Sequence, residues 1–108
     1  MPAYNKLVRD NIPQIIARTG ATSRTRILGD EEYLQELQTK LREETAEYME
    51  TTNAENALEE LADVLEVVRA LAVAHGADWE QLESIRQQKA EQRGGFRDKV
   101  YLIDVDES

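Results

Sequence analysis

Two stretches of the sequence place acidic residues where a helical repeat calls for apolar ones, and this conflict constrains the fold most strongly. Between positions 30 and 50, apolar residues recur at helical spacing: Tyr33, Leu34, Leu37, Leu41 and Tyr48. At roughly 100° per residue, Glu44 falls inside the sector that these side chains occupy, and Glu47 borders it. The first stretch therefore predicts a long helix with carboxylates on its buried face.

The second stretch, between positions 54 and 74, repeats the anomaly with Glu60 and Asp63. An ionised carboxylate is costly to bury unless it takes up a proton or meets a cation. If a turn near residue 52 makes the two helices antiparallel, Glu44 and Glu60 lie at the same height. We therefore expect four acids to converge on one cavity and to bind a hard cation, Mg²⁺ or Mn²⁺, through oxygen: Glu44, Glu47, Glu60 and Asp63. The alternative is a solvated acidic surface, as for most Glu-x-x-Glu pairs.

Capping signals predict four helices. The first spans about 10–19 and the second runs from 30 to about 50; the third spans about 54–74 and the fourth 79 to about 93. The residues that we expect at or near their N-terminal caps are Asp10, Asp30, Thr52 with Glu55, and Asp78 with Gln81.

The tail from Lys99 to Val105 alternates and is rich in Val, Tyr, Leu and Ile, which predicts a strand paired with residues 26–28. The expected fold is all-α: a small bundle of four helices with this minor C-terminal β element, in one domain over residues 1–108. The third helix is apolar around most of its girth, so we also expect a homodimer or homotetramer.

Composition narrows the chemistry. The 108 residues carry a formal net charge of -9, with no cysteine and a single histidine, His75. This excludes thiolate catalysis, zinc-thiolate sites and multi-histidine metal centres. The acidic balance argues against binding to a nucleic acid polymer. No apolar run is long enough for a membrane span and no signal-peptide core is present, so we expect a cytoplasmic protein without a membrane partner.

The acidic pattern reads Glu43-Glu44-Thr45-Ala46-Glu47, twelve residues, then Glu60-Leu61-Ala62-Asp63. It resembles the signature of the MazG-like all-α nucleoside triphosphate pyrophosphohydrolases, which include phosphoribosyl-ATP pyrophosphohydrolase and dimeric dUTPases. The segments 4–10 and 89–96 resemble the ends of a compact branch predicted to clear noncanonical nucleotides. One departure is Asn11, where that branch usually carries Lys.

The resemblance implies a Mg²⁺-dependent enzyme that cleaves a nucleoside triphosphate between its α and β phosphates, giving a nucleoside monophosphate and pyrophosphate. It implies that Glu44, Glu47, Glu60 and Asp63 hold Mg²⁺. Glu43 and Glu47 are the candidate catalytic carboxylates, with Glu43 supporting the ligands, binding a second metal ion or acting as the base for the attacking water.

Four basic residues are candidates for phosphate binding. Lys89 and Arg93 share one face of the fourth helix, and Lys6 and Arg9 are further candidates. Ordinary surface charge at a helix C-terminus is the competing interpretation of the Lys89 and Arg93 pair. We interpret Lys40 as a counter-ion for Glu44 and Glu36.

Two alternatives to this enzyme remain open from sequence. One is a non-catalytic helical scaffold whose acids form salt bridges between chains. The other keeps the chemistry but changes the substrate to phosphoribosyl-ATP or dUTP.

Overall fold

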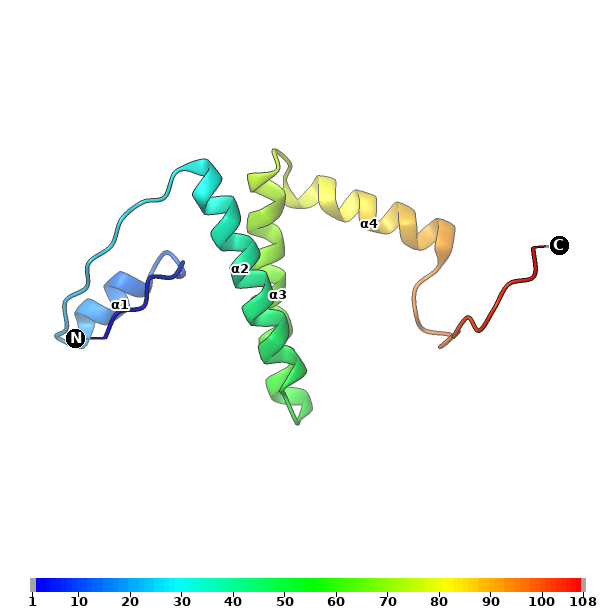
Figure 1. Cartoon of the computed structure of the whole chain (residues 1–108), viewed down its shortest axis with the longest axis horizontal. Coiled ribbons are helices and arrows are strands. Elements are labelled where there is room, and N and C mark those ends of the chain that lie inside the picture. Colours follow the sequence, from blue (N-terminus) through cyan, green and yellow to red (C-terminus); the bar gives the residue numbers. More distant parts are fainter. Residues whose placement is uncertain (1, 108) are drawn as a thin grey trace.

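Four helices make up the regular structure of the protein. The computed structural model describes residues 2–107, with α1 (Ile12–Arg18), α2 (Asp30–Met49), α3 (Ala54–Ala74) and α4 (Trp79–Arg93). Helices α2 and α3 form a hairpin. Helix α4 extends from the end of the hairpin opposite the α2–α3 turn, and α1 lies on the side of α2 that faces away from α3 (Figure 1). The all-α prediction is therefore confirmed.

The hairpin brings together the two apolar stripes that the sequence predicts. Leu37 on α2 and Ala72 on α3 are the buried apolar residues, at 4% and 8% exposure. Other members of the stripes, such as Leu41 and Val67, are half-buried. One short interface between two helices thus supplies the core.

Cap residues differ from the sequence prediction at three of the four helices. Asn53 caps α3, and its Oδ1 accepts the Asn56 backbone N–H at 2.8 Å, in place of the predicted Thr52. Asn11 and Gly29 stand at the N-caps of α1 and α2, where we predicted Asp10 and Asp30. Each predicted cap lies one residue away from the observed one, because residues that can cap a helix are adjacent at these three positions.

The capping box at α4 is confirmed. Asp78 Oδ1 accepts the Gln81 backbone N–H at 2.8 Å, and Gln81 Oε1 accepts the Asp78 N–H at 3.1 Å. Gly76 turns the chain between α3 and α4 with a φ of 84°, a left-handed conformation that glycine adopts without strain. The Arg69 guanidinium lies 5.2 Å from the centre of the Trp79 ring and joins the two helices at this corner.

The predicted C-terminal strand is wrong. Residues 99–105 have no regular secondary structure, and the part of the chain from 2 to 107 contains no strand. A strand needs a neighbour to pair its backbone groups, and this segment lies far from residues 26–28 (Figure 1). Tyr101 and Ile103 are 89% and 86% exposed.

The chain leaves much of its apolar surface uncovered. Its accessible surface is 9952 Å², whereas a compact protein of this mass exposes about 6,100 Å². Its radius of gyration is 18.7 Å, against about 13 Å for a compact chain of this length. Within residues 2–107, no helix combines the length and apolar character needed to cross a membrane.

Candidate metal centre

Three of the four predicted metal ligands meet between α2 and α3. Oxygen atoms of Glu44, Glu47 and Glu60 all lie within 4.8 Å of one another. Glu44 and Glu47 are three residues apart on α2 and so share a face of that helix. The tight turn at residues 50–53 makes α3 antiparallel and brings Glu60 level with them. We call these three residues the carboxylate cluster.

Two carboxyl oxygens of the cluster are buried without any hydrogen-bond donor. These are Glu44 Oε2 and Glu60 Oε2. A buried acceptor without a partner costs free energy, and a buried charge costs more. The sequence correctly predicts that these acids lie on the buried faces of their helices.

The environment of the cluster favours the protonated form of two of its acids. Burial raises the pKa of Glu44, the charges of Glu47 and Asp63 raise it further, and Lys40 lowers it in part. Burial also raises the pKa of Glu60, with Glu47 as the next largest cause. Both shifts have the same causes, which are partial desolvation and neighbouring carboxylates.

The donor set fits a hard divalent cation. All candidate ligands are carboxylate oxygens, which Mg²⁺ and Mn²⁺ prefer. Three oxygens within 4.8 Å can face one ion, and such an ion would partner the two buried oxygens that lack donors. The cluster is therefore a candidate site for a divalent cation.

Asp63, the fourth predicted ligand, is engaged elsewhere. Its Oδ1 accepts a hydrogen bond from Arg9 Nη2 at 2.7 Å. The two residues are 54 positions apart, so this ion pair holds the N-terminal segment, residues 2–10, against α3. Asp63 is one helical turn beyond Glu60 on the side away from the α2–α3 turn, next to the cluster.

Glu43 is the nearest partner of Lys40. Lys40 Nζ lies 3.6 Å from Glu43 Oε2, and the lysine side chain is only 20% exposed. Its charge also lowers the pKa of Glu44, which agrees with the predicted counter-ion role toward that residue. The structure pairs it with Glu43 instead of Glu36.

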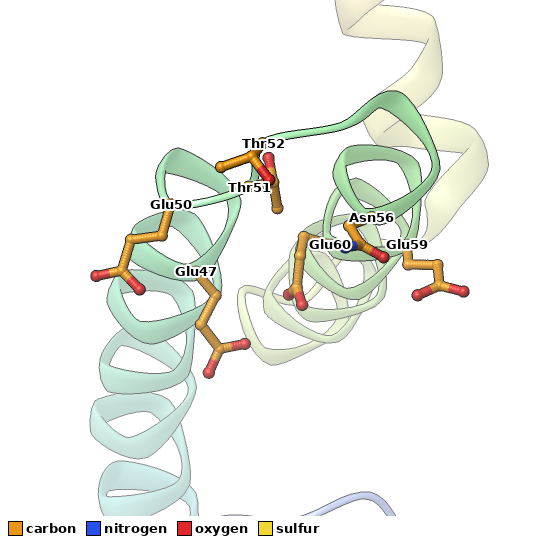
Figure 2. Close-up of a pocket in the computed structure, with 7 residues that line it drawn as sticks. All are labelled: Glu47, Glu50, Thr51, Thr52, Asn56, Glu59 and Glu60. Atoms are coloured by element: carbon orange, nitrogen blue, oxygen red, sulfur yellow. The ribbon is translucent and has the colours of Figure 1, made fainter.

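An open recess of about 310 Å³ adjoins the cluster at the turn end of the hairpin. Glu47 and Glu60 extend into the space between the helices, whereas Glu50 and Glu59 point outward on opposite sides (Figure 2). We call it the turn recess; its lining residues are Glu47, Glu50, Thr51, Thr52, Asn56, Glu59 and Glu60.

Asn56 lines the turn recess but is not among the residues predicted from the sequence. Its position four residues before Glu60, on the same face of α3, is the signal that could have revealed it.

A second recess, of about 150 Å³, lies between the N-terminal segment and α2. Lys6 lies in it with its Nζ 5.6 Å from the centre of the Tyr4 ring. We call it the N-terminal recess; its lining residues are Tyr4, Asn5, Lys6, Leu7, Glu36, Thr39, Lys40 and Glu43.

The other two predicted phosphate-binding residues lie away from the cluster. Lys89 and Arg93 are on α4, which leaves the hairpin at the end opposite the turn (Figure 1). From Glu60 to the end of α3 is about 20 Å along the helix. Within one chain, Arg9 thus lies beside the candidate ligand Asp63, and Lys6 lines the same recess as Glu43. Lys89 and Arg93 do not lie near the cluster.

Comparison with known protein families shows the family of this chain. The chain matches the phosphoribosyl-ATP pyrophosphohydrolase family over residues 11–90. It belongs to the phosphoribosyl-ATP pyrophosphohydrolase family. The matched region contains the carboxylate cluster, Glu43, Asp63 and Lys89, and leaves out Lys6, Arg9 and Arg93. This confirms the predicted superfamily.

The chain is also similar to an uncharacterized protein of Mycolicibacterium smegmatis. It is 44% identical over 54 residues, which are 50% of this chain and 55% of that protein. The aligned region thus spans about half the length of each. No solved structure is similar enough to the chain to be compared with it.

Proposed function

We propose that this protein is a Mg²⁺-dependent nucleoside triphosphate pyrophosphohydrolase, with Mn²⁺ as a substitute ion. It cleaves between the α and β phosphates, releases a nucleoside monophosphate and pyrophosphate, and acts on noncanonical nucleotides in the cytoplasm. One observation carries the proposal: Glu44 and Glu60 bury carboxyl oxygens that have no donor, beside a third carboxylate, Glu47. A divalent cation is the partner that this arrangement lacks.

The residues have distinct roles in this proposal. Glu44, Glu47, Glu60 and Asp63 would hold the metal ion, which would supply positive charge against the phosphates and lower the pKa of a nearby water. Glu43 and Glu47 are the acids with exposed side chains next to the buried ligands. One of the two accepts the proton of the attacking water, and Lys40 Nζ lies 3.6 Å from Glu43 Oε2.

Cations stabilise the leaving pyrophosphate in this scheme. Lys6 and Arg9 belong to the segment that packs beside the cluster of their own chain. Lys89 and Arg93 lie on a helix directed away from it, so they would reach the cluster of a second copy.

We also propose that a second copy of the chain covers the exposed face of α3, in a homodimer or homotetramer built from this single domain. Leu58, Leu61 and Leu65 are 68%, 43% and 47% exposed. The chain exposes several thousand Å² more than a compact protein of its mass, which is more than the area of a standard protein interface. Two hairpins that pack through α3 would remove part of this excess.

Pyrophosphate release from a nucleotide panel tests the function. The panel contains noncanonical nucleoside triphosphates, canonical ones, dUTP and phosphoribosyl-ATP, each with and without Mg²⁺. We expect Mg²⁺-dependent release that is lost in Glu60→Gln and retained in Glu66→Gln, an exposed acid on the same helix. Release from no member of the panel, or equal release without divalent metal, would contradict the proposal.

A further inference from the structure

The two recesses flank the carboxylate cluster along the hairpin. In the antiparallel pair, Glu44 is level with Glu60. The turn recess lies beyond this level toward residues 50–53, and the N-terminal recess lies on the other side, against residues 36–43 of α2. A molecule bound at the cluster therefore has two different environments at its two ends.

Charge distinguishes the two environments. Four carboxylates and no cation line the turn recess. The N-terminal recess has two lysines, Lys6 and Lys40, against two carboxylates, and Arg9 lies nearby on the α3 side. Phosphate oxygens are repelled by the first set of groups and have ammonium and guanidinium donors available in the second.

The N-terminal segment is held across the gap between the two helices. Its residues 4–7 line the recess opposite residues of α2, and Arg9 pairs with Asp63 on α3. Asn5 has a φ of 46°, a left-handed conformation that asparagine tolerates. It bends the chain there and brings Lys6 and the Tyr4 ring together. Within residues 2–107, Lys6 has no ion-pair partner.

We propose that Lys6 in the N-terminal recess and Arg9 on the α3 side of it together bind the two terminal phosphates of the nucleotide, so that the nucleoside end points toward the turn recess. This inference rests on the proposed function and adds the direction in which the substrate lies. Lys6 and Arg9 are outside the region matched to the family, so the direction of the substrate is argued from the two recesses and their charges.

Arg9 has a second role in this arrangement. In the free chain its guanidinium contacts a single oxygen of Asp63, and both side chains are about half exposed. Breaking this ion pair therefore costs little free energy. When the substrate is bound, the same guanidinium donates to a terminal phosphate oxygen, and Asp63 becomes available as a ligand.

Binding of inorganic pyrophosphate tests this proposal without knowledge of the preferred nucleotide. Calorimetry in excess Mn²⁺ measures pyrophosphate affinity, and a separate titration measures Mn²⁺ alone. We expect Lys6→Met and Arg9→Met each to weaken pyrophosphate binding about tenfold or more, because each removes charged hydrogen-bond donors. Arg9→Lys should retain most of the affinity. Mn²⁺ affinity should stay unchanged or rise in Arg9→Met.

Arg26→Met is the matched control. Arg26 also forms an exposed ion pair at 2.7 Å, with Glu32, and neither residue lines the recess. This variant should bind pyrophosphate as the wild type does. Circular dichroism checks that every variant keeps its helices, and Lys6→Met decides the matter if Arg9→Met does not fold.

Three results would overturn the inference. They are pyrophosphate affinity within about twofold of wild type in both Lys6→Met and Arg9→Met, an equal loss in Arg26→Met, and a loss of Mn²⁺ affinity in Arg9→Met that matches its loss of pyrophosphate affinity. A wild-type protein that binds Mn²⁺ but not pyrophosphate overturns only this inference, whereas one that binds no Mn²⁺ removes the proposed function as well.

Discussion

Glu44 and Glu60 lie across the α2–α3 interface from each other, and each buries a carboxyl oxygen that no donor reaches. Such an arrangement is unfavourable in a chain without a cation, because two acids are desolvated together. Protonation relieves part of the cost, which is why burial raises the pKa of both groups. A bound divalent cation would relieve it at neutral pH.

Replacing the ligands with isosteric amides tests their roles. We expect Glu44→Gln and Asp63→Asn each to lower turnover at least about a hundredfold, because a neutral amide is a poor Mg²⁺ ligand. Helical circular dichroism should be intact, since neither acid contributes to the core. Glu66→Gln is the control on an exposed face, and activity near wild type in Glu44→Gln would refute the assignment.

Stability of the metal-free protein should depend on pH in an unusual direction. The pKa values of Glu44 and Glu60 are raised above the ordinary 4.5 in the folded state. As pH falls from neutral through these raised values, the folded state takes up protons before the unfolded state does, so the free energy of unfolding increases. This increase in the free energy of unfolding is complete near pH 4.5, and it is lost as pH rises through the raised pKa values of the folded state.

Urea denaturation between pH 7.5 and 5, with chelator present, measures this effect. The double variant Glu44→Gln/Glu60→Gln should be more stable than wild type at pH 7.5 and nearly independent of pH over this range. Ion pairs such as Arg26 with Glu32 and Arg86 with Glu83 lower the pKa of their acids, so their opposite effect lies below this window. A wild-type protein that loses stability steadily from pH 7.5 to 5 would be inconsistent with buried, uncompensated acids.

Assembly should depend on the exposed face of α3. We expect Leu61→Lys and Leu65→Lys to shift the protein toward monomer, because each places a charge in the proposed interface between copies. Analytical ultracentrifugation at one protein concentration gives the mass. Gln38→Lys on the exposed side of α2 is the control. A wild-type protein that sediments as a monomer at micromolar concentration would rule out this interface.

The capping box of α4 gives a stability test independent of the metal site. Asp78→Ala removes the acceptor for the Gln81 backbone N–H, and we expect a loss of about 1 kcal/mol in the free energy of unfolding. Ser84→Ala, at an exposed position inside α4, should change it by less than about 0.5 kcal/mol. Equal effects of the two substitutions would show that the cap contributes nothing particular.

Hydrophobic periodicity and residue spacing correctly predicted the features of the α2–α3 hairpin. The stripes around Leu37 and Leu71, the turn near residue 52 and the position of Glu44 opposite Glu60 depend on helix geometry alone. The capping residues were less certain, because Thr52 and Asn53 are adjacent and both can accept an N–H.

Long-range contacts were not predictable in the same way. Nothing in the spacing of Arg9 and Asp63 indicates that they pair across 54 residues, because that contact depends on how the N-terminal segment folds back. The strand expected at Lys99 to Val105 failed for a related reason. Its alternation is a real β signal, but pairing requires a second strand, and residues 26–28 lie elsewhere.

The effect of Mg²⁺ on thermal unfolding tests the central claim most directly. At fixed protein concentration, a ligand that binds only the folded state at about 100 times its Kd adds about 2.7 kcal/mol to stability. We predict a rise of several degrees in the Tm of wild type and of Glu66→Gln, and no rise in Glu44→Gln/Glu60→Gln. An unchanged wild-type Tm at millimolar Mg²⁺ and Mn²⁺, or an equal rise in the double variant, would contradict a metal site between α2 and α3.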